Sequence, residues 1–240
     1  MLRYQQLAYE RFTCGSTLIS NGDIGLLGVS DEKSARNYTG NNHGSIEQLN
    51  GQWYVFYHRQ TNQHHFSRQE CAEQIQILPD SRIPQVEVTS QGLNGKPLRG
   101  IGTYDARMAC NLFSKNGAMM YELIALHNKL AHHPYFTQDG ANREDQPNQY
   151  IANMQDGATV GFKYFDFKDA NTLAITTQGS GQGKMLVKDG SNGTVVATIP
   201  VQPGDGLATT HAPLTITPGK HAPYFLLSRA RARSIFCVLS

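Results

Sequence analysis

The chain has 240 residues, enough for one large β domain or two small ones, and either arrangement can bury a core. Charge is nearly balanced, with 21 Lys and Arg against 19 Asp and Glu, which gives no electrostatic reason to expect a nucleic acid or a membrane as partner. The 23 glycines and 10 prolines separate short runs that contain many of the 11 tyrosines and 10 phenylalanines, a pattern typical of strands linked by turns. We therefore expect a mostly β protein that binds neutral ligands.

The cysteines and the N-terminal residues predict the cellular compartment of the chain. The four cysteines are widely spaced, without a C-x-x-C pair or a dense disulfide framework: Cys14, Cys71, Cys110 and Cys237. Free thiols in a reducing compartment fit this pattern. The N-terminal residues have no apolar segment of the kind found in signal peptides, and no window approaches the ~20 apolar residues of a membrane span. We expect a soluble, cytoplasmic chain, while export of a full-length parent protein stays open.

The first clear element is a hairpin within residues 43–58. Its turn is Asn50-Gly51, the strongest short turn signal, and the β-rich residues 53–57 form the return strand. A third strand is expected at 71–78, where alternate residues share one face, and 79–81 then turn the chain. Strands and turns in this order predict a propeller blade.

From about residue 97 onward, short strands alternate with tight turns. The expected strands are 104–113, 149–154, 158–167, 172–177, 184–187 and 194–199. The turns between them contain Asp-Gly, Asn-Gly and Asp-Ala-Asn sequences, which is the signature of an antiparallel sandwich. Residues 116–147 are polar and are expected to form a long surface loop with one short helix at 121–129.

Two parts of the chain resemble known families. Gly40-Asn-Asn-His43-Gly-Ser-Ile46, Gly51-Gln-Trp-Tyr-Val-Phe-Tyr-His-Arg59 and Phe66-Ser-Arg68 resemble the closing blades of the five-bladed propeller of glycoside hydrolase family 43. Gln149-Tyr-Ile-Ala-Asn-Met-Gln-Asp-Gly157 and Gly161-Phe-Lys-Tyr-Phe-Asp-Phe167 are similar to the family 6 carbohydrate-binding module that follows this catalytic domain in some members. The resemblance implies an all-β chain: a partial five-bladed β-propeller in residues 1–92, then an antiparallel, jelly-roll-like β-sandwich in 93–240.

The resemblance also implies a function. Enzymes of this family are arabinofuranosidases or xylosidases that hydrolyse O-glycosyl bonds of plant polysaccharides and oligosaccharides with inversion, which needs two carboxyl groups about 6.5 to 9.5 Å apart. By the same resemblance, the catalytic Asp, Asp and Glu lie on earlier blades, before this chain begins. We therefore expect a truncated glycosidase with no catalytic residue of its own, inactive by itself. The alternative is a non-catalytic carbohydrate-binding or structural accessory chain.

Two residues match the family's active-site contributors. His43 corresponds to the motif histidine near the propeller axis, and Arg68 corresponds to the arginine that reaches the terminal sugar. An imidazole can orient water or a carboxylate, and a guanidinium offers forked donors to sugar hydroxyls. A lone histidine beside a turn can equally be structural.

In the sandwich, exposed aromatic rings would stack on sugars while amides fix their hydroxyls. The candidates for such contacts are Tyr150, Asn153, Phe162 and Tyr164, although the same residues can simply fill the core. The loop 203–208 lacks the tryptophan that such modules often carry. No cofactor is required, and the resemblance leaves room for a Ca²⁺ ion near the propeller axis or in the sandwich.

Partners follow from these features. We expect an arabinose- or xylose-containing oligosaccharide or polysaccharide and neither nucleic acid nor membrane. The missing N-terminal blades or a second copy are further partners, because a part-propeller leaves open strand edges.

The histidine pairs at 64–65 and 132–133 do not favour a metal site, because neighbours in a strand point to opposite faces. Arginine alternates with alanine at 229–233, from which we hypothesise a frameshift between residues 227 and 234.

Overall fold

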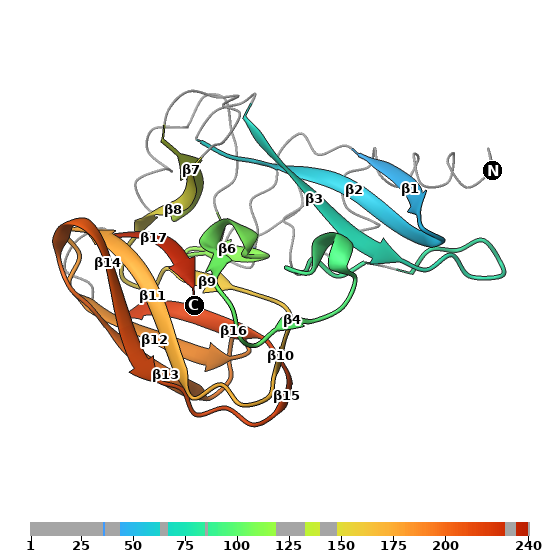
Figure 1. Ribbon diagram of the computed structural model, residues 1–240. Helices are drawn as coiled ribbons and strands as arrows, with labels where there is room; N and C mark the ends of the chain where they lie inside the picture. The colour runs from blue at the N-terminus through green and yellow to red at the C-terminus, as the bar shows by residue number, and fades with distance from the viewer. Residues whose placement is uncertain are drawn as a thin grey trace.

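The computed structural model describes residue 36 and residues 44–62, 67–84, 86–118, 133–139, 148–228 and 234–239. Within these ranges strands dominate, and the helical elements are the short 3₁₀ turns η1 (Gly92–Asn94) and η2 (Ala106–Met108). The expected all-β class is therefore confirmed (Figure 1). The predicted helix at 121–129 and the predicted site residue His43 lie outside the described residues. In the described part of the chain, no helix is long and apolar enough to cross a membrane.

The N-terminal sheet contains β1 (Ser45–Leu49), β2 (Gln52–Gln60) and β3 (Arg68–Ile75), paired antiparallel in that order. The predicted hairpin is confirmed, with Leu49 opposite Gln52. Its turn residues Asn50 and Gly51 have φ values of 50° and 82°, the left-handed conformation that this two-residue turn requires. The third strand begins and ends three residues earlier than predicted, because Ile75 pairs with Trp53 near the start of β2 and residues 76–78 lie beyond the end of this pairing.

One face of this sheet is buried. Val55 on β2 and Ile75 on β3 are 0% and 3% exposed. They share a small core with Tyr57 of β2, with Val86 and Val88 from the segment that follows β3, and with Cys110 from the sandwich. Because alternate residues of a strand face the same side, the positions adjacent to these in sequence face away from this core. The sheet therefore has a core-facing side and an outer side.

The sandwich consists of two main sheets and one small sheet (Figure 1). The six-stranded sheet has the order β14-β11-β17-β8-β7, with β5 paired to β17, and the five-stranded sheet has the order β13-β12-β16-β9-β6. The small sheet, β15-β10-β4, includes one parallel pair, β10 with β4. The strands are β4 (Leu98–Arg99), β5 (Tyr104–Asp105), β6 (Asn111–Phe113), β7 (Tyr135–Gln138), β8 (Gln149–Met154), β9 (Thr159–Gly161), β10 (Phe165–Phe167), β11 (Thr172–Gly179), β12 (Gly183–Asp189), β13 (Val195–Val201), β14 (Gly204–Pro213), β15 (Gly219–His221), β16 (Pro223–Ser228) and β17 (Ser234–Leu239).

The main core lies between these sheets. Strand β13 shows the origin of this core: Ala197, Ile199 and Val201 are buried and the residues between them are exposed. Phe162 and Phe225 are both 0% exposed and meet edge to face, with 5.7 Å between ring centroids. Burial of such aromatic and branched side chains is the main stabilising contribution to the sandwich.

Several predicted elements need correction. The strand expected at 104–113 is interrupted by η2, and the strand expected at 158–167 divides into β9 and β10. The second break arises because the carbonyls of Lys163 and Tyr164 accept hydrogen bonds from Ser90 and Leu98 rather than from one neighbouring strand. The expected loop 203–208 is instead the start of β14, and the expected loop 116–147 contains β7. In both cases pairing with a distant strand overrides weak local β propensity.

Residues 229–233, on which the frameshift hypothesis depends, lie outside the described residues. The following residues, Ser234–Leu239, form β17 between β8 and β11.

Contacts also cross the expected domain division at residue 92. Tyr54 on β2 donates a hydrogen bond to the Leu93 carbonyl at 3.1 Å. The division itself stays a prediction.

Candidate functional site

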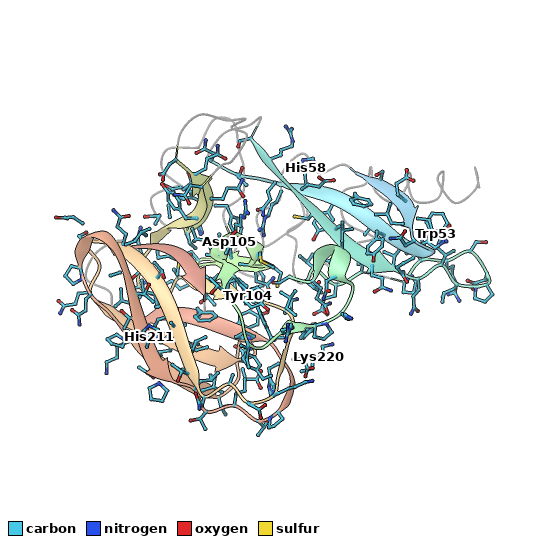
Figure 2. The ribbon with its side chains drawn as sticks, viewed as in Figure 1. Trp53, His58, Tyr104, Asp105, His211 and Lys220 are labelled. Atoms are coloured by element: carbon cyan, nitrogen blue, oxygen red, sulfur yellow. The ribbon has the colours of Figure 1, made fainter. Side chains whose placement is uncertain are left out.

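Arg68 begins β3 and lies on the outer side of the N-terminal sheet. Its Nε donates a hydrogen bond to Nε2 of His58 at 3.1 Å. The register pairs His58 with Glu70 and Gln60 with Arg68, so the two bonded side chains are diagonal neighbours on one face. The bond requires an unprotonated Nε2, which ties the orientation of Arg68 to the neutral form of His58. Figure 2 shows His58 toward the opposite end of β2 from Trp53.

Arg59 lies on the core-facing side and connects the sheet to the sandwich. Its Nε donates to Gln69 Oε1 at 2.8 Å, and its two terminal nitrogens donate to the carbonyls of Ala109 and Arg107. The guanidinium carbon also lies 3.7 Å from the centre of the Phe136 ring. Arg59 thus fixes the sheet to two segments of the sandwich, while the predicted site residue Arg68 faces the other way.

Glu73 is a buried carboxyl on the core-facing side of β3, 4% exposed. Its side chain accepts hydrogen bonds from the Thr89 amide (2.7 Å), the Thr89 hydroxyl (2.6 Å) and the Tyr57 hydroxyl (3.2 Å). Burial raises the pKa of Glu73 to about 7, although the hydrogen bonds from Thr89 act in the opposite direction. Glu73 alternates with Cys71 and Ile75 on the face that packs into the small core, and the segment that covers it returns from beyond residue 83.

A polar cavity of about 350 Å³ adjoins Glu73. Its polar lining comes from β3 and from the segment after it: Glu73, Gln74, Gln76, Glu87, Thr89 and Gln91. Glu73 and Arg68 are five positions apart on one strand, so they point to opposite faces. The structure therefore does not bring this carboxyl together with the predicted active-site arginine, and the hydrogen bonds of Glu73 give it a structural role.

Tyr164, a predicted sugar contact, is engaged by protein groups on both its hydroxyl and its ring. The hydroxyl donates to the Glu87 carboxylate, with distances of 2.8 and 2.9 Å to the two oxygens. The Lys220 ammonium lies 3.8 Å from the ring centre, and Lys163 pairs with Glu87 at 3.1 Å. Burial, followed by the hydrogen bond to Glu87, raises the pKa of Tyr164 to about 12. This cluster attaches the segment after β3 to the sandwich.

The other predicted sugar contacts lie elsewhere in the sandwich. Tyr150 on β8 donates its hydroxyl to Asp139 Oδ1 at 3.0 Å. Asn153, on the same strand, is 7% exposed and donates its amide to the His133 carbonyl at 2.8 Å. Tyr164 precedes β10 in a different sheet, so these residues are divided between two places. Sugar contact by Tyr150, Asn153 and Tyr164 stays a prediction, whereas Phe162 fills the core, as the alternative interpretation held.

The described part of the chain contains no group of three or more His, Cys, Asp or Glu residues arranged to hold a metal ion. It therefore supplies no cluster of this kind for the Ca²⁺ ion that the family resemblance leaves room for. His133 is buried, and its Nδ1 contacts Ser114 Oγ at 3.1 Å and the Gly117 carbonyl at 3.0 Å. The described thiols, Cys71 and Cys110, form no disulfide.

No protein-family model matches the chain. A xylosidase/arabinosidase of Thermoclostridium stercorarium is 43% identical over 216 residues, which cover 89% of this chain and 45% of that protein. The chain thus spans less than half the length of this relative.

One solved structure shows a similar fold. A glycoside hydrolase family 43 arabinoxylan arabinofuranohydrolase from Bacillus subtilis, in complex with cellotetraose, aligns with a TM-score of 0.55 and 17% identity, covering 84% of this chain and 40% of that enzyme. A family 6 carbohydrate-binding module from Clostridium cellulolyticum, in complex with xylose, aligns with a TM-score of 0.43 and 12% identity, covering 58% of this chain and 95% of that module.

The relative and the family 43 structure confirm the resemblance to family 43 inferred from the sequence. The chain is related to a protein named as a xylosidase/arabinosidase, and it has the all-β fold of the matching part of a family 43 enzyme.

Proposed function

We propose that this chain is part of a glycosidase resembling family 43, which removes arabinofuranosyl or xylosyl units from plant oligosaccharides or polysaccharides. The observation that carries the proposal is 43% identity over 216 residues to a xylosidase/arabinosidase. Because the chain spans 45% of that relative, we further propose that the catalytic Asp, Asp and Glu belong to a segment that precedes it. The likeness in fold to a family 43 enzyme supports this proposal.

Arg68 is the residue of the described chain that we assign to the terminal sugar. A guanidinium carries five N–H donors in a planar fork, which suits sugar hydroxyls and carboxylates. One of these donors, Nε–H, is bonded to His58, and this bond restricts rotation of the side chain. Holding the fork in one orientation lowers the entropic cost of binding a sugar.

The sandwich has a supporting role in this proposal. Arg59 joins it to β2 through two carbonyls and the Phe136 ring, so the outer side of the sheet, with Arg68, is held at a fixed position relative to the sandwich. A bound sugar chain would then meet both parts in a constant arrangement.

A second candidate function is a non-catalytic carbohydrate-binding or structural chain. Glu73 favours it: this buried carboxyl has a pKa near neutrality, as an acid catalyst would, but it faces away from Arg68 and its oxygens accept three hydrogen bonds within the protein. A carboxyl in this position stabilises the fold rather than protonating a leaving group.

The deciding experiment measures hydrolysis of p-nitrophenyl α-L-arabinofuranoside and β-D-xyloside, with calorimetric titration of arabinose, xylose and xylo-oligosaccharides in parallel. We expect no turnover by the chain alone. Turnover should appear when the N-terminal half of the Thermoclostridium relative is joined ahead of it, and Arg68→Ala should reduce that turnover by about 10- to 100-fold, as expected for a lost positioning contact.

Arg82→Ala serves as the matched control, because the Arg82 side chain is exposed and pairs with Asp80 in a turn. Turnover by the chain alone would contradict the absence of catalytic carboxyls. A folded fusion that binds sugars without turnover would favour the accessory function.

A further inference from the structure

A second cavity, of about 270 Å³, enters the sandwich from the end that carries the β4–β5 and β10–β11 loops. Its floor is apolar and buried between the sheets, where Val187 and Phe225 are both 0% exposed. Leu173 and Leu214 extend this floor and are 8% and 7% exposed. At the mouth, Ile101 is 65% exposed. The cavity is therefore an apolar space that connects the core to solvent.

Three aromatic rings form part of the wall. Tyr104, labelled in Figure 2, meets Phe165 edge to face with 5.0 Å between centroids, and Phe165 lies 6.0 Å from Phe167. The Tyr104 hydroxyl donates to the Arg99 carbonyl at 2.7 Å, so the polar end of this ring is already paired within the protein. The wall thus offers ring faces and edges rather than hydrogen bonds. An aromatic guest can extend this packing, because ring pairs favour offset and edge-to-face arrangements.

The same lining disfavours a sugar. A pyranose in this space would bury several hydroxyls among aliphatic and aromatic side chains, and a buried hydroxyl without a partner is costly. Polar side chains occur at the mouth, where Asp169, Asn171 and Thr172 are exposed. These polar side chains can hydrogen-bond a single hydroxyl of a ligand when that hydroxyl remains at the surface. The lining contains one carboxylate and neither lysine nor arginine, which disfavours an anionic ligand.

We propose that this cavity binds a monocyclic aromatic ligand with a neutral polar substituent, such as a phenol. The ring packs between Phe165, Phe167 and the apolar floor, and the hydroxyl lies at the mouth beside Asp169 or Asn171. Size agrees with this assignment, since an apolar cavity of about 150 Å³ accommodates benzene. The site is separate from Arg68 and does not depend on the proposed glycosidase function.

The test is methyl-detected NMR of the full chain titrated with p-cresol. The methyl signals of Val187 and Leu214 should shift saturably, with the roughly millimolar Kd typical of a ligand this small. Benzoate, which carries a negative charge past Asp169, should bind more weakly, and xylose should leave these signals unchanged. Absence of a saturable shift with p-cresol, or equal shifts with xylose, would overturn the proposal.

Neighbouring valines on β13 provide a matched pair of variants. Val196 lines the cavity, whereas Val195 is 50% exposed and is absent from the lining. Val196→Phe should weaken p-cresol binding by at least about tenfold by filling the space, and Val195→Phe should bind like the unchanged chain. Ala170→Leu, a smaller change at the same cavity, keeps the test valid if Val196→Phe does not fold. Equal affinity in folded Val196→Phe and Val195→Phe would refute the assignment.

Discussion

Replacement of Glu73 by glutamine should change how stability depends on pH. Its pKa is about 7 in the folded chain, against an ordinary value of 4.5, so the folded state binds more protons than the unfolded state between these values. The stability that the folded chain gains from protonation of Glu73 is therefore fully present below about pH 4.5 and is lost as pH rises through 7. A difference of 2.5 units corresponds to about 3 kcal/mol at 1.36 kcal/mol per unit.

Glutamine retains much of the local hydrogen bonding but carries no charge. Its amide oxygen can accept from the Thr89 N–H and its amide nitrogen can donate to the Thr89 hydroxyl. The free energy of unfolding of Glu73→Gln, relative to the unchanged chain, should therefore rise by about 2.5 kcal/mol between pH 5 and pH 8. Urea unfolding at four pH values in this range measures the difference directly.

Glu70→Gln is the matched control, because Glu70 lies three positions away on the same strand and is exposed. Its stability should follow the unchanged chain at every pH. Parallel stability curves for Glu73→Gln and the unchanged chain would refute the reasoning, since they would mean that ionisation of Glu73 is not coupled to folding.

Three further outcomes follow from the contacts. Arg59→Ala should lower the free energy of unfolding by about 2 to 4 kcal/mol and make the N-terminal sheet more accessible to proteases. Arg59→Lys should restore little of this stability, because an ammonium cannot reproduce the fork of a guanidinium. Urea unfolding and limited proteolysis measure both effects. Phe225→Ala should lower the free energy of unfolding, measured with urea, by about 3 to 5 kcal/mol, whereas Val195→Ala should change it by no more than about 0.5 kcal/mol. His58→Ala should weaken xylose or arabinose binding by the fusion with its relative, because it removes the hydrogen bond that orients Arg68, and calorimetric titration will measure this. Equal binding by His58→Ala and the unchanged fusion would argue against a positioning role.

Local patterns in the sequence predicted the elements that depend on neighbouring residues. The Asn50-Gly51 turn forms as expected because the left-handed conformation of both residues is intrinsic to that dipeptide. The alternation along β13 likewise marks a strand with one face in the core. For the same reason β8, β11, β12 and β13 lie close to the predicted strands 149–154, 172–177, 184–187 and 194–199.

Features built by distant residues were missed. β14 begins with Gly204 and has few buried residues, so only its pairing with β11 reveals it as a strand. The burial of Glu73, the attachment of Arg59 to Ala109 and the hydrogen bond between Arg68 and His58 all depend on segments that meet only in the folded chain. Sequence resemblance proposed Arg68 as a site residue, yet it contained no information about the face to which Arg68 belongs.

The position of β17 also affects how the protein is made. This strand, Ser234–Leu239, comes near the end of the chain but lies inside its sheet, bonded to β11 on one side and to β8 and β5 on the other. During synthesis, β8 and β11 emerge from the ribosome long before their common neighbour, with exposed edges that invite pairing with other chains. Completion of the six-stranded sheet must therefore wait until β17 has been synthesised, after every other strand of that sheet.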